Sequence, residues 1–134
     1  MKSINKETIQ KINLFENITK SKVKDILDED KLIVIVESGE LKKALGKNNV
    51  NLNRIERLFR KKLRIIEYDN DPVKFIKHYT YPLKIDEITL SNNILEIKVV
   101  DRITKGLLIG SDGRNLNKLS SLVKDYFNLE IKVL

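Results

Sequence analysis

The chain has 134 residues, and its 26 lysine and arginine residues exceed its 19 acidic residues, giving a formal net charge of +7. Hydrophobic residues make up 41% and charged residues 34%, which excludes a disordered tail and fits one ordinary domain or two very small ones. The absence of cysteine excludes a disulfide scaffold and a thiolate zinc site, so we expect an intracellular, cytoplasmic protein. The longest apolar run, residues 32–36, is far shorter than the roughly 20 residues of a membrane-spanning helix, so we expect no membrane partner.

In its first half, the sequence predicts a helix, two strands, two helices and a third strand. Near-helical spacing of apolar residues predicts the first helix over 4–15. Aliphatic runs predict antiparallel strands over 23–27 and 32–36, and the second, wholly aliphatic strand should be buried on both faces. A short helix over 41–45, a glycine turn, a longer amphipathic helix and a strand over 63–68 complete this half.

The second half is predicted to begin with a helix that Asp71 caps and Pro72 opens. Strands over 83–90 and 94–100 follow, and the alternation in the second of these predicts one core-facing side. A short helix over 104–109, a second glycine turn, a long helix and a strand over the last six residues complete the chain. The two halves thus have the same order of elements.

A shift of 64 residues superimposes the two halves around their glycine turns. It places Leu45-Gly46 on Ile109-Gly110, Asn51-Leu52-Asn53 on Asn115-Leu116-Asn117, and Arg54 on Lys118. An internal repeat of this kind indicates two copies of one module, which we place at residues 1–70 and 71–134. The apolar positions of the helix that follows each turn, Leu52, Ile55, Leu116 and Leu119, are expected to be core.

Basic residues are concentrated in the first module. Residues 41–64 contain nine basic side chains and one acid, Glu56, a local net charge of +8. The basic positions are Lys42, Lys43, Lys47, Arg54, Arg57, Arg60, Lys61, Lys62 and Arg64. Such a run is either a solvated helix face or a polyanion-binding surface, and its clustering favours the second interpretation.

Each glycine turn leads into the N-terminus of a helix. The first amide groups of a helix lack intrahelical partners and carry partial positive charge, so this position suits a phosphate group. Glycine permits positive φ and lets a phosphodiester approach the backbone closely. The repeated turn is therefore the candidate binding site.

The paired motifs L-G-K-x-x-x-N-x-x-R and I-G-x-x-G-x-N-x-x-K, within this order of elements, resemble the bacterial-type KH domain. A tandem pair with almost no linker resembles the archaeal NusA-like transcription factor family over nearly the whole chain. The resemblance implies an α+β fold of two tandem type II KH domains, each a three-stranded sheet packed against helices. It also implies binding of single-stranded RNA in transcription termination or antitermination. The polymerase-binding domain and oligonucleotide-binding barrel of bacterial relatives do not fit this length, so RNA polymerase is a less certain partner than RNA.

The resemblance also implies roles for individual residues. Gly46 and Gly110 shape the turns, and the backbone around Lys47, Asn48, Asn49, Ser111, Asp112 and Gly113 would contact phosphates. Positive charge would come from Lys47, Arg54, Arg114 and Lys118. Asn51 and Asn115 are either RNA contacts or helix-capping residues.

Two positions depart from the family pattern. Asn49 replaces the last glycine of the first turn, and we expect the turn to survive because asparagine tolerates left-handed backbone better than other residues. Asp112 places a negative charge where phosphate would approach, which weakens an electrostatic role for the second turn. A degenerate KH pair that docks a protein partner is therefore an alternative, as is RNA binding in the ribosome or in RNA processing.

Catalysis is not expected. His78 is the single histidine, and neither a nucleophile–histidine–acid set nor a nucleotide-binding glycine motif can be assembled. The acidic residues around Asp28 and Asp71 fit turns and a helix cap better than a metal centre. We therefore expect a monomeric binding protein with no enzymatic activity, cofactor or metal.

Overall fold

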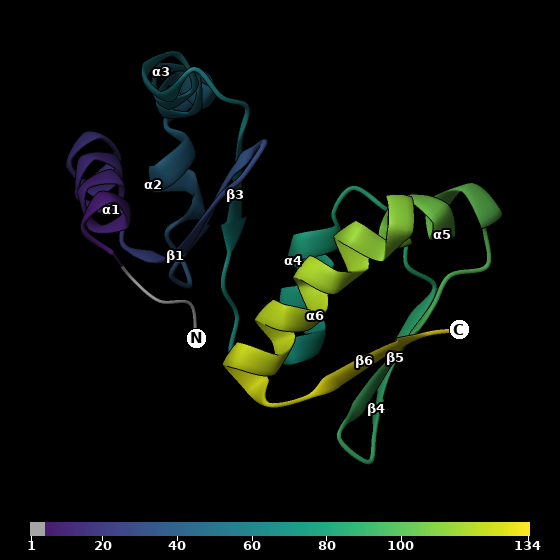
Figure 1. The fold of residues 1–134 in the computed structure, drawn as a ribbon. Coiled ribbons are helices and arrows are strands. Elements are labelled where there is room, and N and C mark those ends of the chain that lie inside the picture. Colours follow the sequence, from purple (N-terminus) through teal and green to yellow (C-terminus); the bar gives the residue numbers. More distant parts are fainter. Residues whose placement is uncertain (1–4) are drawn as a thin grey trace. The chain divides into compact units, whose positions relative to one another are not determined.

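The computed structural model describes residues 5–134, which form two compact units, residues 5–69 and Asn70–Leu134 (Figure 1). In each unit a helix and two strands are followed by a helix, a one-turn 3-10 helix, a longer helix and a third strand. This α+β order is the one expected of two tandem bacterial-type KH domains. Ile4, the first residue of the first predicted helix, lies outside the described residues.

The first unit has one three-stranded sheet in the order β1-β2-β3. Its elements are α1 (Lys6–Thr19), β1 (Val23–Asp28), β2 (Leu32–Val36), α2 (Leu41–Leu45), η1 (Lys47–Asn49), α3 (Val50–Phe59) and β3 (Leu63–Glu67). Strand β1 is antiparallel to β2, whereas β2 and β3 are parallel. Because parallel neighbours cannot be joined by a tight turn, α2, η1 and α3 together form the connection from β2 to β3.

The second unit repeats this topology with the sheet order β4-β5-β6. Its elements are α4 (Pro72–Thr80), β4 (Glu87–Ser91), β5 (Ile94–Lys98), α5 (Arg102–Ile109), η2 (Ser111–Gly113), α6 (Arg114–Phe127) and β6 (Glu130–Val133). The pair β4–β5 is antiparallel and the pair β5–β6 is parallel. The glycine turn therefore lies between equivalent elements in both units.

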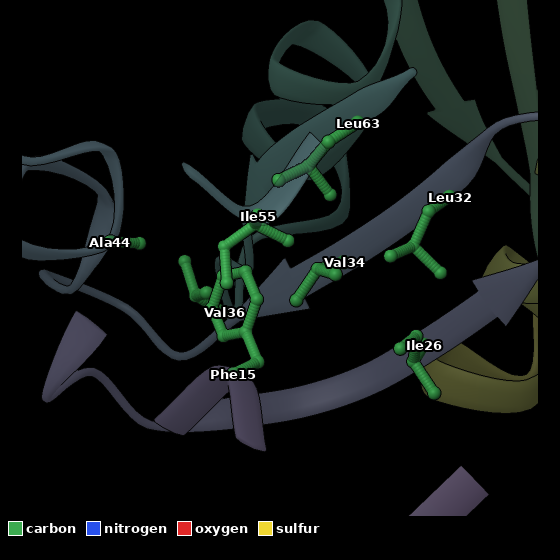
Figure 2. Close-up of a cluster of buried hydrophobic side chains, with 8 residues drawn as sticks. All are labelled: Phe15, Ile26, Leu32, Val34, Val36, Ala44, Ile55 and Leu63. Atoms are coloured by element: carbon green, nitrogen blue, oxygen red, sulfur yellow. The ribbon is translucent and has the colours of Figure 1, made fainter. Parts of the chain in front are cut away.

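Helices of the first unit pack their apolar residues on one face of its sheet (Figure 2). The cluster consists of Phe15, Ile26, Leu32, Val34, Val36, Ala44, Ile55 and Leu63. Alternate residues of a strand point to opposite faces, so Ile33 and Ile35 of β2 lie on the other side of the sheet. Both are buried as well, which confirms that β2 is buried on both faces.

Strand β5 and helix α4 of the second unit also match the sequence. Leu95 and Ile97 are buried between more exposed neighbours, which confirms the predicted alternation. Asp71 caps α4 by accepting a 2.9 Å hydrogen bond from the Val73 amide, and Pro72 is the first helical residue. Phe75 on α4 meets the Tyr126 ring on α6 edge-on, with the ring centroids 5.6 Å apart.

Several element boundaries differ from the sequence prediction. Helix α1 extends past Phe15 to Thr19, whose buried hydroxyl donates to the Phe15 carbonyl over 2.9 Å. Strand β4 begins only at Glu87, because the chain first forms a turn in which the Leu83 amide donates to the Thr80 carbonyl. Irregular backbone thus replaces the first part of the predicted strand.

Helix α5 begins at Arg102, two residues before the predicted start, because Asp101 caps it. The Asp101 carboxylate accepts hydrogen bonds from the backbone amide and hydroxyl of Thr104, at 2.9 and 2.7 Å. These bonds lower the pKa of the Asp101 carboxyl below its usual value, since they favour the charged form.

Asp28, at the end of β1, links three elements of the first unit. Its carboxylate accepts hydrogen bonds from the ammonium groups of Lys11 on α1 and Lys61 after α3. Partial burial alone would raise the pKa of Asp28, but the bonds from the two lysines outweigh it and hold the pKa below its usual value. The hydrogen bond to Asp28 correspondingly raises the pKa of Lys11.

Replacing Ile55 or Leu119 with alanine should destabilise the protein by about 2–5 kcal/mol, the usual cost of a cavity at a fully buried site. Both side chains are almost completely buried, on α3 and α6 respectively. Leu58→Ala on the exposed side of α3 is the control and should change the free energy of unfolding by less than about 0.5 kcal/mol. Urea titration monitored by circular dichroism measures all three values.

Asp28→Asn should reduce stability at neutral pH by no more than about 1 kcal/mol, because the ion pairs are partly exposed. Since the folded-state pKa of Asp28 is lowered, its contribution is present above the unfolded pKa of about 3.9 and is lost as pH falls through the folded value. The stabilities of the two proteins should therefore converge below about pH 4. A difference that persists unchanged at pH 2 would contradict this account.

Candidate nucleic-acid interface

The first glycine of each turn has a backbone conformation that requires glycine. Gly46 has φ 75° and ψ 169°, and Gly110 has φ 76° and ψ 174°, a region essentially restricted to glycine. A Cβ at Gly46 would lie 2.9 Å from Cγ of Asn51, and a Cβ at Gly110 would lie 2.7 Å from Cγ of Asn115. Both conformation and space therefore exclude a side chain here.

The third and fourth residues of the two turns also share one conformation. Asn48 and Asp112 are left-handed, with φ 55° and 56°. Asn49 has φ 59° and ψ 28°, close to the 73° and 14° of Gly113, which confirms that asparagine preserves the first turn. A Cβ at Gly113 would come no closer than 3.9 Å to its nearest neighbouring atom. This position thus demands left-handed backbone but not the absence of a side chain.

Asn51 and Asn115 connect the two helices that flank each turn. The Asn51 side-chain amide donates to the Lys43 carbonyl over 3.1 Å, and that of Asn115 donates to the Leu107 carbonyl over 3.0 Å. Each therefore satisfies a carbonyl in the last turn of the preceding helix, where carbonyls lack intrahelical partners. Neither is the N-cap of its own helix, because Asn49 and Gly113 occupy those positions. Each asparagine instead bonds to the C-terminal end of the preceding helix.

Each turn is closed by a hydrogen bond from the amide of its fourth residue to the carbonyl of its first, 3.1 Å in the first turn and 3.2 Å in the second. The amides of the second and third residues donate to no protein acceptor in residues 5–134. These residues are Lys47 and Asn48 in the first turn and Ser111 and Asp112 in the second. All four are exposed, so each turn offers two amide donors to a ligand.

The charges around the two turns differ. Lys47 and Arg54 are exposed beside the first turn. Arg114 is exposed beside the second turn, but Lys118 is half-buried and Asp112 adds a negative charge. The first turn therefore has the more positive surroundings.

Exposed apolar side chains beside the second turn were not identified from the sequence. Val100 precedes α5, and Ile103 and Leu107 lie on it. Their side chains are 72%, 74% and 56% exposed. The same shift of 64 residues places Ile103 on Gly39 and Leu107 on Lys43, so the first unit lacks this apolar surface. Two features of the sequence could have revealed this surface. Ile103 and Leu107 are four residues apart, and the first copy has no apolar residue at either position.

The sequence also singled out His78 and the acidic residues as possible sites of chemistry. His78 lies half-buried on α4, and residues 5–134 contain no group of three or more histidine, aspartate or glutamate side chains that could hold a metal ion. No helix in the described residues is long and apolar enough to cross a membrane.

Comparison with known proteins relates the chain to one group of relatives. The crystal structure of APE1850 matches it with a TM-score of 0.73 at 23% identity, over 98% of this chain and 100% of that one, which shows the fold. The probable transcription termination protein NusA of Methanococcus vannielii is 29% identical over 120 residues, covering 86% of this chain and 69% of that protein.

The protein of the same name from Methanocaldococcus jannaschii is 30% identical over 134 aligned residues, which span 96% of this chain and 73% of that protein. The protein of the same name from Halococcus morrhuae is 26% identical over 125 residues, and the alignment covers 90% of that protein. No family model matches the chain. The extent of these alignments and the shared fold place the chain in the archaeal NusA-like family.

Proposed function

We propose that the chain binds single-stranded RNA through the main-chain amides of its two glycine turns and acts in transcription termination or antitermination. The observation that carries this proposal is the repetition of one turn conformation in two units of different local sequence. Two available amides at the start of a helix are suited to a phosphate group, and a G-x-x-G loop of this kind clamps about four nucleotides in KH domains.

Family membership supports the biological context. The relatives are named probable transcription termination proteins, and we extend that role to this chain. RNA polymerase is a candidate partner through the same family. We further propose that the protein is a cytoplasmic monomer and acts by binding rather than by catalysis.

A degenerate pair that docks a protein is the alternative, and Asn49 and Asp112 are the residues that favoured it. The conformation of Asn49 counts against it, because the substitution leaves the backbone of the turn unchanged. Asp112 retains the matching conformation as well, so the second turn differs from the first in its side chains and their charge but not in its backbone. RNA binding in the ribosome or in RNA processing would use the same surface and differs in the RNA recognised.

Asn48 and Asp112 allow a reciprocal test, because they occupy the same place with the same left-handed backbone. Asn48→Asp should weaken RNA binding, and Asp112→Asn should strengthen it. Two unit charges about 5 Å apart in water interact by roughly 0.8 kcal/mol, so each change should be about fourfold at low salt. Fluorescence anisotropy with a random-sequence RNA dodecamer measures the dissociation constants.

The exchange keeps side-chain shape, so the thermal midpoints of both variants should match that of the unchanged protein. Glu7→Gln, at an exposed position on α1, removes one acidic charge from a residue outside the two turns and should have little effect. Equal RNA affinity in all four proteins would argue against phosphate contact at the turns.

Salt dependence distinguishes RNA binding from protein docking. If about six phosphates are contacted, the logarithm of affinity should fall against the logarithm of salt concentration with a slope near −4. Single-stranded RNA should also outcompete duplex DNA, whose paired bases cannot be splayed into a narrow site. Absence of measurable RNA binding at low salt would exclude the proposed function.

A further inference from the structure

A shallow depression of about 620 Å³ lies along the C-terminal half of α3 and the residues that follow it. It is lined by Asn53, Glu56, Arg57, Arg60, Lys61 and Lys62. Four of these six residues are basic and one is acidic. They belong to the basic run of the first unit, but they lie outside the set of residues assigned to the turn.

The one acidic side chain of the depression, Glu56, is hydrogen-bonded to the backbone. The Glu56 carboxylate accepts a 2.8 Å hydrogen bond from the Leu63 amide. Lys61 is also engaged, because its ammonium donates to Asp28 over 2.5 Å and to the Glu29 carbonyl over 2.8 Å. Arg57, Arg60 and Lys62 are exposed and form no ion pair within residues 5–134.

The second unit shows that the fold does not require this charge. The corresponding end of α6 carries Lys124, Asp125 and Asn128, in which the basic and acidic charges balance. Lys124 is, in addition, paired with Glu130 over 3.1 Å. Of the two described units, only the first therefore carries a cluster of unpaired cations at this end of the helix.

The depression is separated from the turn by the body of α3. Asn51 faces α2, because its side chain bonds to the Lys43 carbonyl. Asn53, two residues later, lies about 200° around the helix axis and so faces away from α2. The cations Arg57, Arg60 and Lys62 lie in or after the last turn of α3, about 10 Å or more along the helix from its first residue. A group bound in the depression is therefore distinct from one bound at the turn.

We propose that Arg57, Arg60 and Lys62 bind phosphates of the RNA outside the nucleotides held by the turn, so that the first unit contacts the strand at two places. This inference rests on the proposed function. The chemistry favours a phosphodiester backbone, because guanidinium groups match phosphate oxygens in a two-bonded geometry and an ammonium adds a flexible charge. An open depression with no apolar lining residue suits a solvated strand better than the apolar core of a protein interface.

The test compares the unchanged protein with the triple variant Arg57→Gln, Arg60→Gln, Lys62→Gln, using the random-sequence RNA dodecamer. The matched control removes equal charge elsewhere, with Lys6→Gln, Lys20→Gln and Lys74→Gln at exposed positions. The depression variant should bind RNA at least about fivefold more weakly, with a salt slope shallower by about 0.7 for each phosphate that the variant no longer neutralises. The control should stay within about twofold. Unchanged thermal midpoints, expected at exposed sites, show that both variants fold.

Equal affinity and slope for the unchanged protein and the depression variant would overturn the inference while leaving the turn proposal intact. An equal reduction of affinity in the control would also overturn it, since total charge would then explain the effect. If the unchanged protein fails to bind RNA, the proposed function itself fails. An RNA titration followed by amide NMR gives a second readout: residues 57–62 should shift together with residues 46–50, and shifts confined to the turn would count against a second contact.

Discussion

The close approach of a glycine to an asparagine side chain determines the geometry of both candidate sites. In each unit the asparagine amide bonds to a carbonyl of the preceding helix, and its side chain lies too close to the glycine to leave room for a Cβ. The glycine and the asparagine therefore depend on each other. If a side chain replaced the glycine hydrogen, the asparagine could not keep its hydrogen bond, and the angle between the two helices would no longer be held. The main-chain amides of the turn are oriented by this contact rather than by any side chain that faces solvent.

Comparing the two copies of the module distinguishes the features that the fold requires from the features that are specific to one copy. The turn conformation, the glycine–asparagine contact and the sheet topology are common to both units. Exposed groups differ: the first unit carries cations without ion pairs at and just after the end of α3, whereas the second carries Ile103 and Leu107 on α5. Electrostatic attraction is long-ranged and insensitive to base identity, while apolar surface favours contact with bases. Under the proposed RNA binding, the first unit would supply more of the electrostatic attraction and the second more of the contact with bases.

Much of this architecture could be predicted because its determinants are local in sequence. Aliphatic runs identify β2 and β5, and Asp71 followed by Pro72 identifies the start of α4. The two turns were recognisable because a repeat of 64 residues makes a weak four-residue motif appear twice. The left-handed conformation of Asn49 could be predicted from the backbone preference of asparagine alone, since this preference belongs to the single residue.

Features that depend on side chains from separate elements were not predictable. The role of Asn51 requires the position of the Lys43 carbonyl, which becomes its neighbour only after the helices fold against each other. Helix α5 begins early because Asp101 caps it through hydrogen bonds from Thr104. Helix α1 continues to Thr19, whose buried hydroxyl donates to the Phe15 carbonyl. The number of cations available in the basic depression likewise depends on which of the nine basic residues form ion pairs. Lys61 is paired with Asp28, which lies 33 residues earlier in the chain.

Because β2 pairs with β3 in parallel, the segment that contains the first turn is anchored in the sheet at both of its ends. The first turn sits inside the chain segment that leaves β2 and returns as its neighbour β3, and the second sits likewise between β5 and β6. Peeling off β6, a strand of four residues at the edge of its sheet, would free one end of the segment that contains the second turn. A ligand that binds this connection in the folded state would stabilise its attachment to the sheet and slow hydrogen exchange in β6.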